Sequence, residues 1–376
     1  MILKNKLLVL LFILGVTAAG AQTGSDEIAE PLIDSLISFS DPTRIWGNGV
    51  EGIIEEAYRL CFKTRILDGK VMNLRMPFAQ NYERDKLSEQ SWEFLGGGKA
   101  KADFLWEAIE GALNSDDFRE YSRALSDGRE KVIIFDIPGQ TWTTSRTLYD
   151  IARMKTEAYY QGLPHQPYVL VSGRGVEETD VYNYLYCVAL TGMDCSGFVW
   201  HVLTYIARAG GLDLGSTLSR ALGVKNGGDP SWYAGTAFYN SRSPQISPVK
   251  DEIHNLKPGD IILFRGADGG MSHSAIIQSV NLTSGLIRYL QCTDEAPLAE
   301  RGVHDSFIRF DPALPGTSLS DPSLNWTQKR YPPFPGEQAS PFSDDGNRYR
   351  AFAELGGGRV VRIRPLVNII EKLNRR

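Results

Sequence analysis

The chain has 376 residues, of which 42 % are hydrophobic and 23 % are charged, and its formal net charge is −5 at pH 7. This length exceeds one average domain and is enough to bury a large core. Basic and acidic residues are mixed along the chain, which argues against a nucleic-acid-binding protein because phosphate recognition needs clustered positive charge.

The first residues have the pattern of an export signal. Lys4 and Lys6 precede an apolar run from Leu7 to Val16, which is shorter than the roughly 20 residues that span a bilayer. Ala19-Gly20-Ala21 then supplies the small residues that a signal peptidase requires. We therefore predict a signal peptide over residues 1–21 and a periplasmic or extracellular protein, with an uncleaved N-terminal anchor as the alternative. No later stretch of the sequence predicts a transmembrane helix.

Residues 22–130 have mainly helical patterns and are predicted to form an N-terminal region of unknown role. Apolar residues recur at three- and four-residue spacing in "EIAEPLIDSLISF", "VEGIIEEAYRLCF" and "KADFLWEAIEGAL". We interpret this region as a packing or spacer module rather than a second active site.

Beyond Pro248 the apolar pattern changes to an alternation typical of strands. In "GDIILF", Ile261 and Leu263 fall on one face, and Ile262 and Phe264 fall on the other. "SHSAIIQSV", "GLIRYLQC" and "RVVRIRPL" continue this alternation and predict an antiparallel sheet. The Pro-rich stretch 311–347 is predicted to be a surface insertion without regular structure. Helices followed by strands indicate an α+β fold.

The four cysteines are Cys61, Cys187, Cys195 and Cys292. None stands in a CxxC pair, so no cysteine zinc site is predicted, and no other spacing indicates a metal or a cofactor. An exported chain can form disulfides, and an unpaired thiol in such a chain then needs a reason, of which catalysis is one.

Cys195 lies at the predicted start of a helix. Apolar residues recur along this helix on one stripe, which predicts that it packs on the sheet: Phe198, Val199, Val202, Leu203 and Ile206. Unpaired amides and the positive end of the helix dipole stabilise a thiolate at such a position. Since the thiolate is the nucleophilic form, the sequence predicts a nucleophile here. Ser196 and Gly197 keep the first turn small, so that a substrate carbonyl can approach.

A thiolate nucleophile needs a partner that protonates the leaving amine, and the chain has five histidines. His273 leads a predicted strand and shares a face with Ala275 and Ile277. That face is expected to be the one that the helix covers, so His273 is ranked first. His304, in "GVHDSF", is ranked second.

The histidine in turn needs a group that fixes its tautomer. Gln291 closes the next predicted strand and can accept the imidazole N–H. Asp294 is the charged alternative, and an ordinary polar strand end remains the simpler interpretation of Gln291.

Three segments, "MDCSGFVW", "LKPGDIILFRG" and "MSHSAIIQSV", resemble the NlpC family (NlpC/p-sixty) of cell-wall cysteine peptidases. The resemblance implies a papain-like α+β domain over residues 145–366. It also implies Cys195 as the nucleophile, His273 as the base and acid, and Gln291 at the third position. "GLPHQPYV" resembles the segment that carries a tyrosine near the nucleophile, here Tyr168.

The resemblance places further residues around the nucleophile. Tyr168 and Asp194 would help to shape the site, and together with Ser196 they form our predicted substrate-binding set. Ser274 departs from the family pattern, because a small apolar residue is commoner directly after the histidine.

The function that the resemblance implies is hydrolysis of peptidoglycan stem peptides, at the bond between γ-D-glutamyl and a diamino acid. The predicted partners are therefore stem peptides and not nucleic acid. Two alternatives remain: a cell-wall amidase or acyltransferase with the same residues, and a non-catalytic wall-binding protein.

Overall fold

The part of the chain that the structure describes lies within one compact unit, Trp46–Arg376. A computed structural model describes residues 49–78, 98–116, 118–119, 122–123, 134–135, 146–147, 176–185, 192–225, 228–266, 269–293, 295–296, 301–329 and 342–375. The predicted signal peptide over residues 1–21 lies outside the described residues, as do Tyr168, Cys187 and Asp294.

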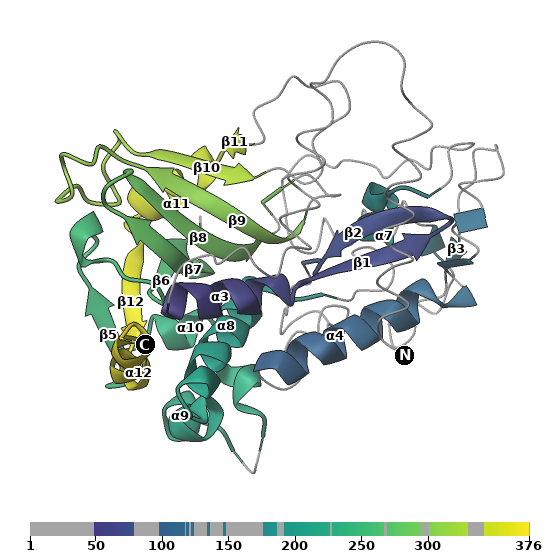
Figure 1. Ribbon diagram of the computed structural model, residues 1–376, viewed down its shortest axis with the longest axis horizontal. Coiled ribbons are helices and arrows are strands. Elements are labelled where there is room, and N and C mark those ends of the chain that lie inside the picture. Colours follow the sequence, from purple (N-terminus) through teal and green to yellow (C-terminus); the bar gives the residue numbers. More distant parts are fainter. Residues whose placement is uncertain are drawn as a thin grey trace. The chain divides into compact units, whose positions relative to one another are not determined.

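An eight-stranded antiparallel sheet is the largest element of the described chain, in the order β11-β10-β9-β8-β7-β6-β12-β5 (Figure 1). Its strands are β5 (Ile246–Val249), β6 (Ile261–Arg265), β7 (Met271–Asn281), β8 (Leu286–Thr293), β9 (Gly302–Arg309), β10 (Asn325–Lys329), β11 (Phe342–Asp344) and β12 (Arg359–Ile363). The antiparallel sheet and its helices confirm the predicted α+β class.

The helices are α3 (Val50–Arg59), α4 (Gly98–Leu113), α7 (Glu178–Tyr184), α8 (Cys195–Ala209), α9 (Leu214–Leu222), α10 (Thr236–Tyr239), α11 (Gly346–Ala353) and α12 (Val367–Leu373). Short 3₁₀ turns are η3 (Pro230–Tyr233), η4 (Ile253–Asn255) and η6 (Arg364–Leu366), and β3 (Ile134–Phe135) pairs with β4 (Arg146–Thr147).

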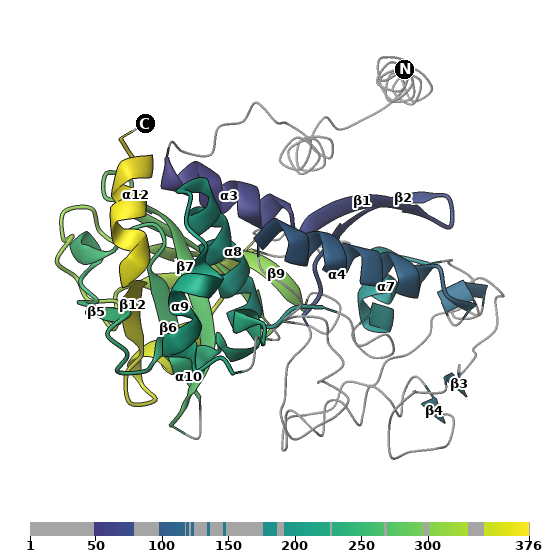
Figure 2. The ribbon, with the colours of Figure 1, turned by 90° about the horizontal axis from the view of Figure 1, so that it is seen from below.

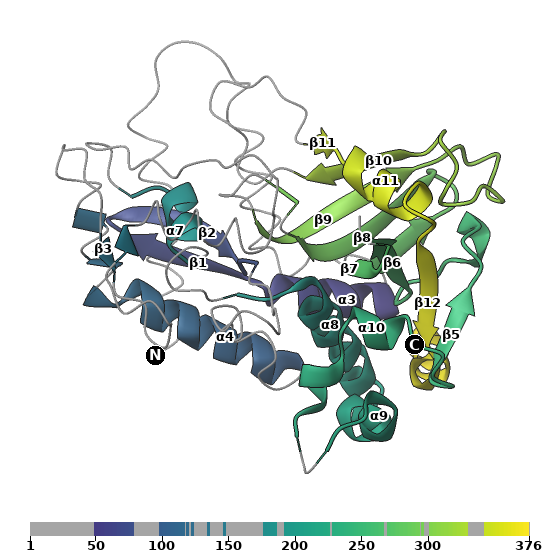
Figure 3. The ribbon, with the colours of Figure 1, turned by 180° about the vertical axis from the view of Figure 1, so that it is seen from behind.

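Both faces of the sheet are apolar and both are covered. Alternation sends Leu263 and Ile276 into one core, which α3 and α8 cover, and sends Phe264 and Ala275 into a second core. Phe352 of α11 packs in the second core, so α8 and α11 cover opposite faces (Figures 1 and 3). Sheets buried on both faces have apolar residues at every position, as "IILF" of β6 does.

The described part of the N-terminal region packs in the same core as α8. Helices α3 and α4 both contact α8 and lie beside it (Figure 2). The prediction of a mainly helical region misses an antiparallel hairpin formed by β1 (Phe62–Leu67) and β2 (Lys70–Arg75). Its two-residue turn is Asp68-Gly69, with φ of 50° and 73°. Asp-Gly between two strands is a strong hairpin signal, because a type I′ turn requires positive φ at both positions.

A buried ionic network joins α3 to the sheet. Arg288 of β8 donates to Glu55 of α3 and, through Nη2, to Asp305 of β9 at 3.2 Å. The Tyr58 hydroxyl of α3 donates to the same aspartate at 3.1 Å. The first described helix is therefore attached to β8 and β9 by charged groups that are largely shielded from water.

The prediction that residues 311–347 lack regular structure is wrong for part of the segment. β10 and β11 both lie within it and extend the sheet beyond β9. The prolines stand outside "NWTQK", whose Trp326 and Gln328 alternate inward, so this short piece keeps every amide that a ladder needs. No helix within the described ranges has the length and apolar character needed to cross a membrane.

Candidate functional site

Cys195 is the first residue of α8, as the sequence predicts. Asp194 is the N-cap, and its carboxylate accepts from the amide of Gly197 and from the Ser196 hydroxyl, the latter at 2.9 Å to Oδ2. Capping thus accounts for both buried polar side chains that flank Cys195. The substrate-binding role assigned to Asp194 and Ser196 stays a prediction.

The thiol of Cys195 is nearly buried. Cys195 has 8 % of its surface exposed, whereas Cys61 and Cys292 have none, and none of the three forms a disulfide. Burial raises the pKa of the Cys195 thiol to about 12, and the charge of Asp194 adds to this effect. The amide and hydroxyl of Ser274 and the guanidinium of Arg348 act in the opposite direction by smaller amounts. The resting sulfur is therefore protonated at neutral pH.

His273 and Gln291 meet as the sequence predicts. Nε2 of His273 lies 2.8 Å from Oε1 of Gln291, and the amide Nε2 of Gln291 donates to Ser306 Oγ at 2.8 Å. Because Gln291 uses its N–H₂ group on the serine, its oxygen faces the ring and accepts a hydrogen bond from the N–H at His273 Nε2. Nδ1 of His273 is then the basic nitrogen.

His273 and Cys195 lie on opposite faces of β7. His273 packs on Phe264, with ring centroids 5.4 Å apart, in the second core. Ser274 pairs with Leu263 on the face that α8 covers. No hydrogen bond joins the Cys195 thiol to His273, although both residues are described. The expectation that α8 covers the face of His273, Ala275 and Ile277 is therefore wrong. Both faces are equally apolar, so hydrophobicity alone does not identify the one that carries the helix.

Sequence reasoning missed Arg348 of α11. It is buried, its guanidinium lies 5.5 Å from the Phe264 ring centroid, and it contacts Thr293 and Glu295 at the end of β8. Burial lowers the pKa of His273 well below its usual value, and the positive charge of Arg348 lowers it further. Only the fold brings Arg348 to the site, since 75 residues separate it from His273 in the sequence.

Tyr239 of α10 is a second residue that the sequence did not indicate. Its side chain is fully buried in the core that α8 shares with the sheet. Burial raises the pKa of its phenol well above 10, and the charges of Asp194 and Cys195 raise it further. The phenol of Tyr239 therefore stays protonated, so it can act as a hydrogen-bond donor.

Two other histidines, His304 and His201, have structural surroundings. His304 holds the carbonyl of Gly302 through Nδ1 at 2.9 Å, and burial lowers its pKa to about 3. His201 bonds the Ala57 carbonyl at 2.9 Å and so connects α8 to α3. Neither histidine has a hydrogen bond to Cys195.

The "PGD" segment before β6 has a structural explanation. Asp260 accepts from the amide of Lys257 at 2.8 Å and from the guanidinium of Arg362 on β12 at 2.6 Å. Gly259 has φ +91°, and a Cβ there would lie 2.9 Å from Ile370. The motif therefore fixes the entry of β6 and its pairing with β12.

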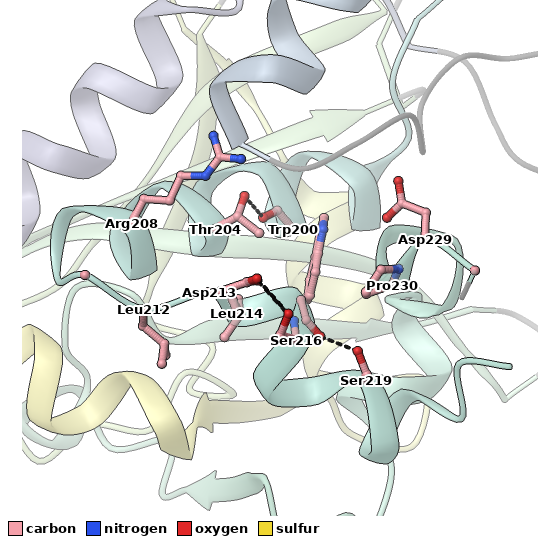
Figure 4. Close-up of a pocket in the computed structure, with 13 residues that line it drawn as sticks. Trp200, Thr204, Arg208, Leu212, Asp213, Leu214, Ser216, Ser219, Asp229 and Pro230 are labelled. Carbon is pink, nitrogen blue, oxygen red and sulfur yellow. Dashed lines mark hydrogen bonds between the residues drawn. The ribbon is translucent and has the colours of Figure 1, made fainter. Parts of the chain in front are cut away.

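A cavity of about 620 Å³ lies on the other side of α8 (Figure 4). Trp200, Thr204 and Arg208 line it at four-residue intervals, roughly half a helical turn away from the sheet-facing residues such as Val202. Asp213, one of the residues across the cavity, is occupied in capping α9. The cavity therefore does not contain the thiol.

The described residues form an α+β protein with a buried cysteine at a helix start and an oriented histidine on the adjoining strand. They contain no cluster of residues suited to a metal ion. No protein-family model matches the sequence, and no curated protein or solved structure shows significant similarity to it.

Proposed function

We propose that the protein is a secreted cysteine peptidase with a papain-like domain of the NlpC type, and that it hydrolyses peptidoglycan stem peptides. One observation carries the proposal. The helix that starts at Cys195 packs on the strand that bears His273, whose Nε2 is held by Gln291 at 2.8 Å. A nucleophile, a base and a group that orients the base are the parts that this chemistry needs. The stem-peptide substrate and the export come from the sequence resemblance and the predicted signal peptide.

In the proposed reaction, His273 Nδ1 takes the proton of the Cys195 thiol. The sulfur bonds to the acyl carbon of the γ-D-glutamyl group, and the C–N bond breaks as the imidazolium gives its proton to the departing amine. Water then attacks the thioester, loses a proton to His273, and the thiol is restored when the C–S bond breaks. Since no hydrogen bond joins Cys195 to His273 in the resting structure, the imidazole has to approach the thiol before the proton can move.

The test is a digest of purified muropeptides followed by mass spectrometry. The wild type should release fragments cut between γ-D-glutamyl and the diamino acid. Cys195→Ala and His273→Ala should leave stems intact, whereas Cys61→Ala, which removes another buried thiol, should cleave normally. Cleavage by Cys195→Ala would refute the proposal. Products cut at the sugar–peptide link would indicate an amidase, and joined stems would indicate an acyltransferase.

One observation favours a non-catalytic stem-binding protein as a second candidate. Burial raises the pKa of the Cys195 thiol to about 12, and His273 makes no hydrogen bond to it. Intact stems in the digest, with saturable stem binding by calorimetry that Cys195→Ala retains, would support this candidate over the peptidase.

A further inference from the structure

Two hydroxyl groups near Cys195 are fully buried and make no hydrogen bond within the part of the chain that the structure describes. They are Oγ of Ser274 and the phenol oxygen of Tyr239, and both residues are 0 % exposed. A buried polar group without a partner costs free energy, so each such group needs an explanation.

Three elements bring these hydroxyls to the sulfur. Ser274 is on β7 and projects to the face that α8 covers, where its amide and hydroxyl influence the thiol of Cys195. Tyr239 ends α10, which Thr236 attaches to the start of β7 by a hydrogen bond from Oγ1 to the Met271 carbonyl at 3.1 Å. Tyr239 responds to the charges of both Cys195 and Asp194.

The first turn of α8 adds the positive end of a helix dipole at the same place. Hydroxyls that lack acceptors while the sulfur is neutral gain acceptors when negative charge develops there. Donors fixed before charge appears stabilise a transition state strongly, since they need no reorganisation.

We infer that the hydroxyls of Ser274 and Tyr239 are hydrogen-bond donors for negative charge at Cys195, first on the sulfur and then on the carbonyl oxygen of the acyl group under attack. The ligand class is thus an acyl donor whose carbonyl carbon is attacked by the sulfur. The inference rests on the proposed function, because it takes Cys195 as the reactive group. It also gives a role to Ser274, which departs from the family pattern.

Two charged groups influence the pKa of the thiol: Asp194, the N-cap of its own helix, and Arg348 of α11, which lies on the other face of the sheet. They oppose one another, because the carboxylate raises the pKa of the thiol and the guanidinium lowers it. Stabilisation of the thiolate therefore has to come largely from neutral donors.

The test measures the rate at which iodoacetamide alkylates Cys195 in the full chain between pH 7 and 10, with peptide mass mapping to assign the label. Ser274→Ala and Tyr239→Phe should each slow alkylation about tenfold at fixed pH, since one pKa unit is a tenfold change in thiolate. The double variant should be slower than either, and Ser274→Thr, which keeps the hydroxyl, should retain most of the rate. The matched control is Tyr182→Phe, which should leave the rate unchanged. It removes a buried hydroxyl that is already hydrogen-bonded, since this hydroxyl donates to Glu178 and accepts from the Arg75 amide.

Urea unfolding separates the proposed role from a structural one. Ser274→Ala and Tyr239→Phe should be at least as stable as the wild type, because each removes a buried group without a partner. Unchanged alkylation in the double variant, or alkylation that falls only in proportion to lost stability, would overturn the inference. Alkylation needs no substrate, so a protein that cleaves no muropeptide but shows the predicted loss of rate would refute the peptidase proposal alone.

Discussion

His273 and Ser274 are consecutive on β7, and their side chains project to opposite faces of the sheet. His273 packs on Phe264 and bonds Gln291, whereas Ser274 lies on the side of the Cys195 thiol. Because strand side chains alternate, a shift of one residue would exchange the two groups. The register of β7 thus decides which group faces the sulfur, and in this structure it is the hydroxyl of Ser274.

His273→Ala should leave the alkylation rate of Cys195, and its pH profile, nearly unchanged in the resting protein. The reason is that no hydrogen bond joins the two side chains, so removing the imidazole takes nothing from the thiol. Stopped-flow alkylation with iodoacetamide checks this result. A rise of about one unit in the thiol pKa of the variant would show that His273 pairs with the thiol in solution.

The stability of the wild type should fall with rising pH above about 9, by up to about 1.4 kcal/mol per pH unit relative to Cys195→Ala. In the unfolded chain the thiol ionises near pH 9, while burial holds the folded pKa at about 12. The folded state therefore binds the extra proton between these values, and stability is present below pH 9 and lost as pH rises towards 12.

Urea unfolding of wild type and Cys195→Ala at pH 8, 9 and 10 measures this difference. Subtracting the unfolding free energies of the two proteins cancels the contributions of the Cys61 and Cys292 thiols, which both proteins contain. Parallel stability curves would show that the thiol of Cys195 ionises at the same pH in the folded and unfolded chain, contrary to its burial.

Alternation along the strands predicted the sheet well, because β6, β7 and β8 carry apolar residues in register with their pairing. It did not predict which face α8 covers, because Leu263 and Phe264 are equally apolar and both faces are buried. The prolines of residues 311–347 indicated a segment without regular structure, so the two short strands β10 and β11 were not predicted. Asp68-Gly69 is a sequence signal for the turn of the β1–β2 hairpin. Helical periodicity on either side of it led to the prediction of a mainly helical region instead.

At the site, local chemistry was predictable and long-range chemistry was not. A capping aspartate before Cys195 and a glutamine at the end of the next strand follow from spacing along one element or two neighbouring strands. Arg348 and Tyr239 come to the two sides of the site only through the packing of α11 and α10, for which single-sequence patterns carry no signal.

Gln291→Ala should lower kcat for stem hydrolysis by about 10²-fold or more with little change in KM, if the proposed peptidase activity is present. Gln291 fixes the His273 tautomer through its oxygen and is itself held by Ser306, so its loss frees the ring to rotate. Steady-state kinetics on one purified muropeptide measure the two constants. A raised KM with an unchanged kcat would show instead that Gln291 serves binding.

Arg288→Met should destabilise the fold by roughly 3–5 kcal/mol in urea unfolding, because it removes the buried cation that pairs with Glu55 and Asp305. Glu55 then keeps only the ion pair with the partly exposed Arg59, at 3.4 Å. The desolvated carboxylates, more than the lost attraction, cause the loss. The triple variant Glu55→Gln, Arg288→Met, Asp305→Asn should therefore recover much of the stability, since it buries no charge.

The matched control is Arg350→Met on α11, where the ion pair with Glu354 spans 3.7 Å and the arginine side chain is 65 % exposed. An exposed pair contributes little because water and salt screen it, so this variant should stay within about 0.5 kcal/mol of the wild type. If Arg288→Met cost no more than this control, α3 would be held to the sheet mainly by its apolar face. The hydrogen bonds from Tyr58 to Asp305 and from Gln278 to the Glu51 carbonyl would then be polar contacts that still align α3 with the sheet.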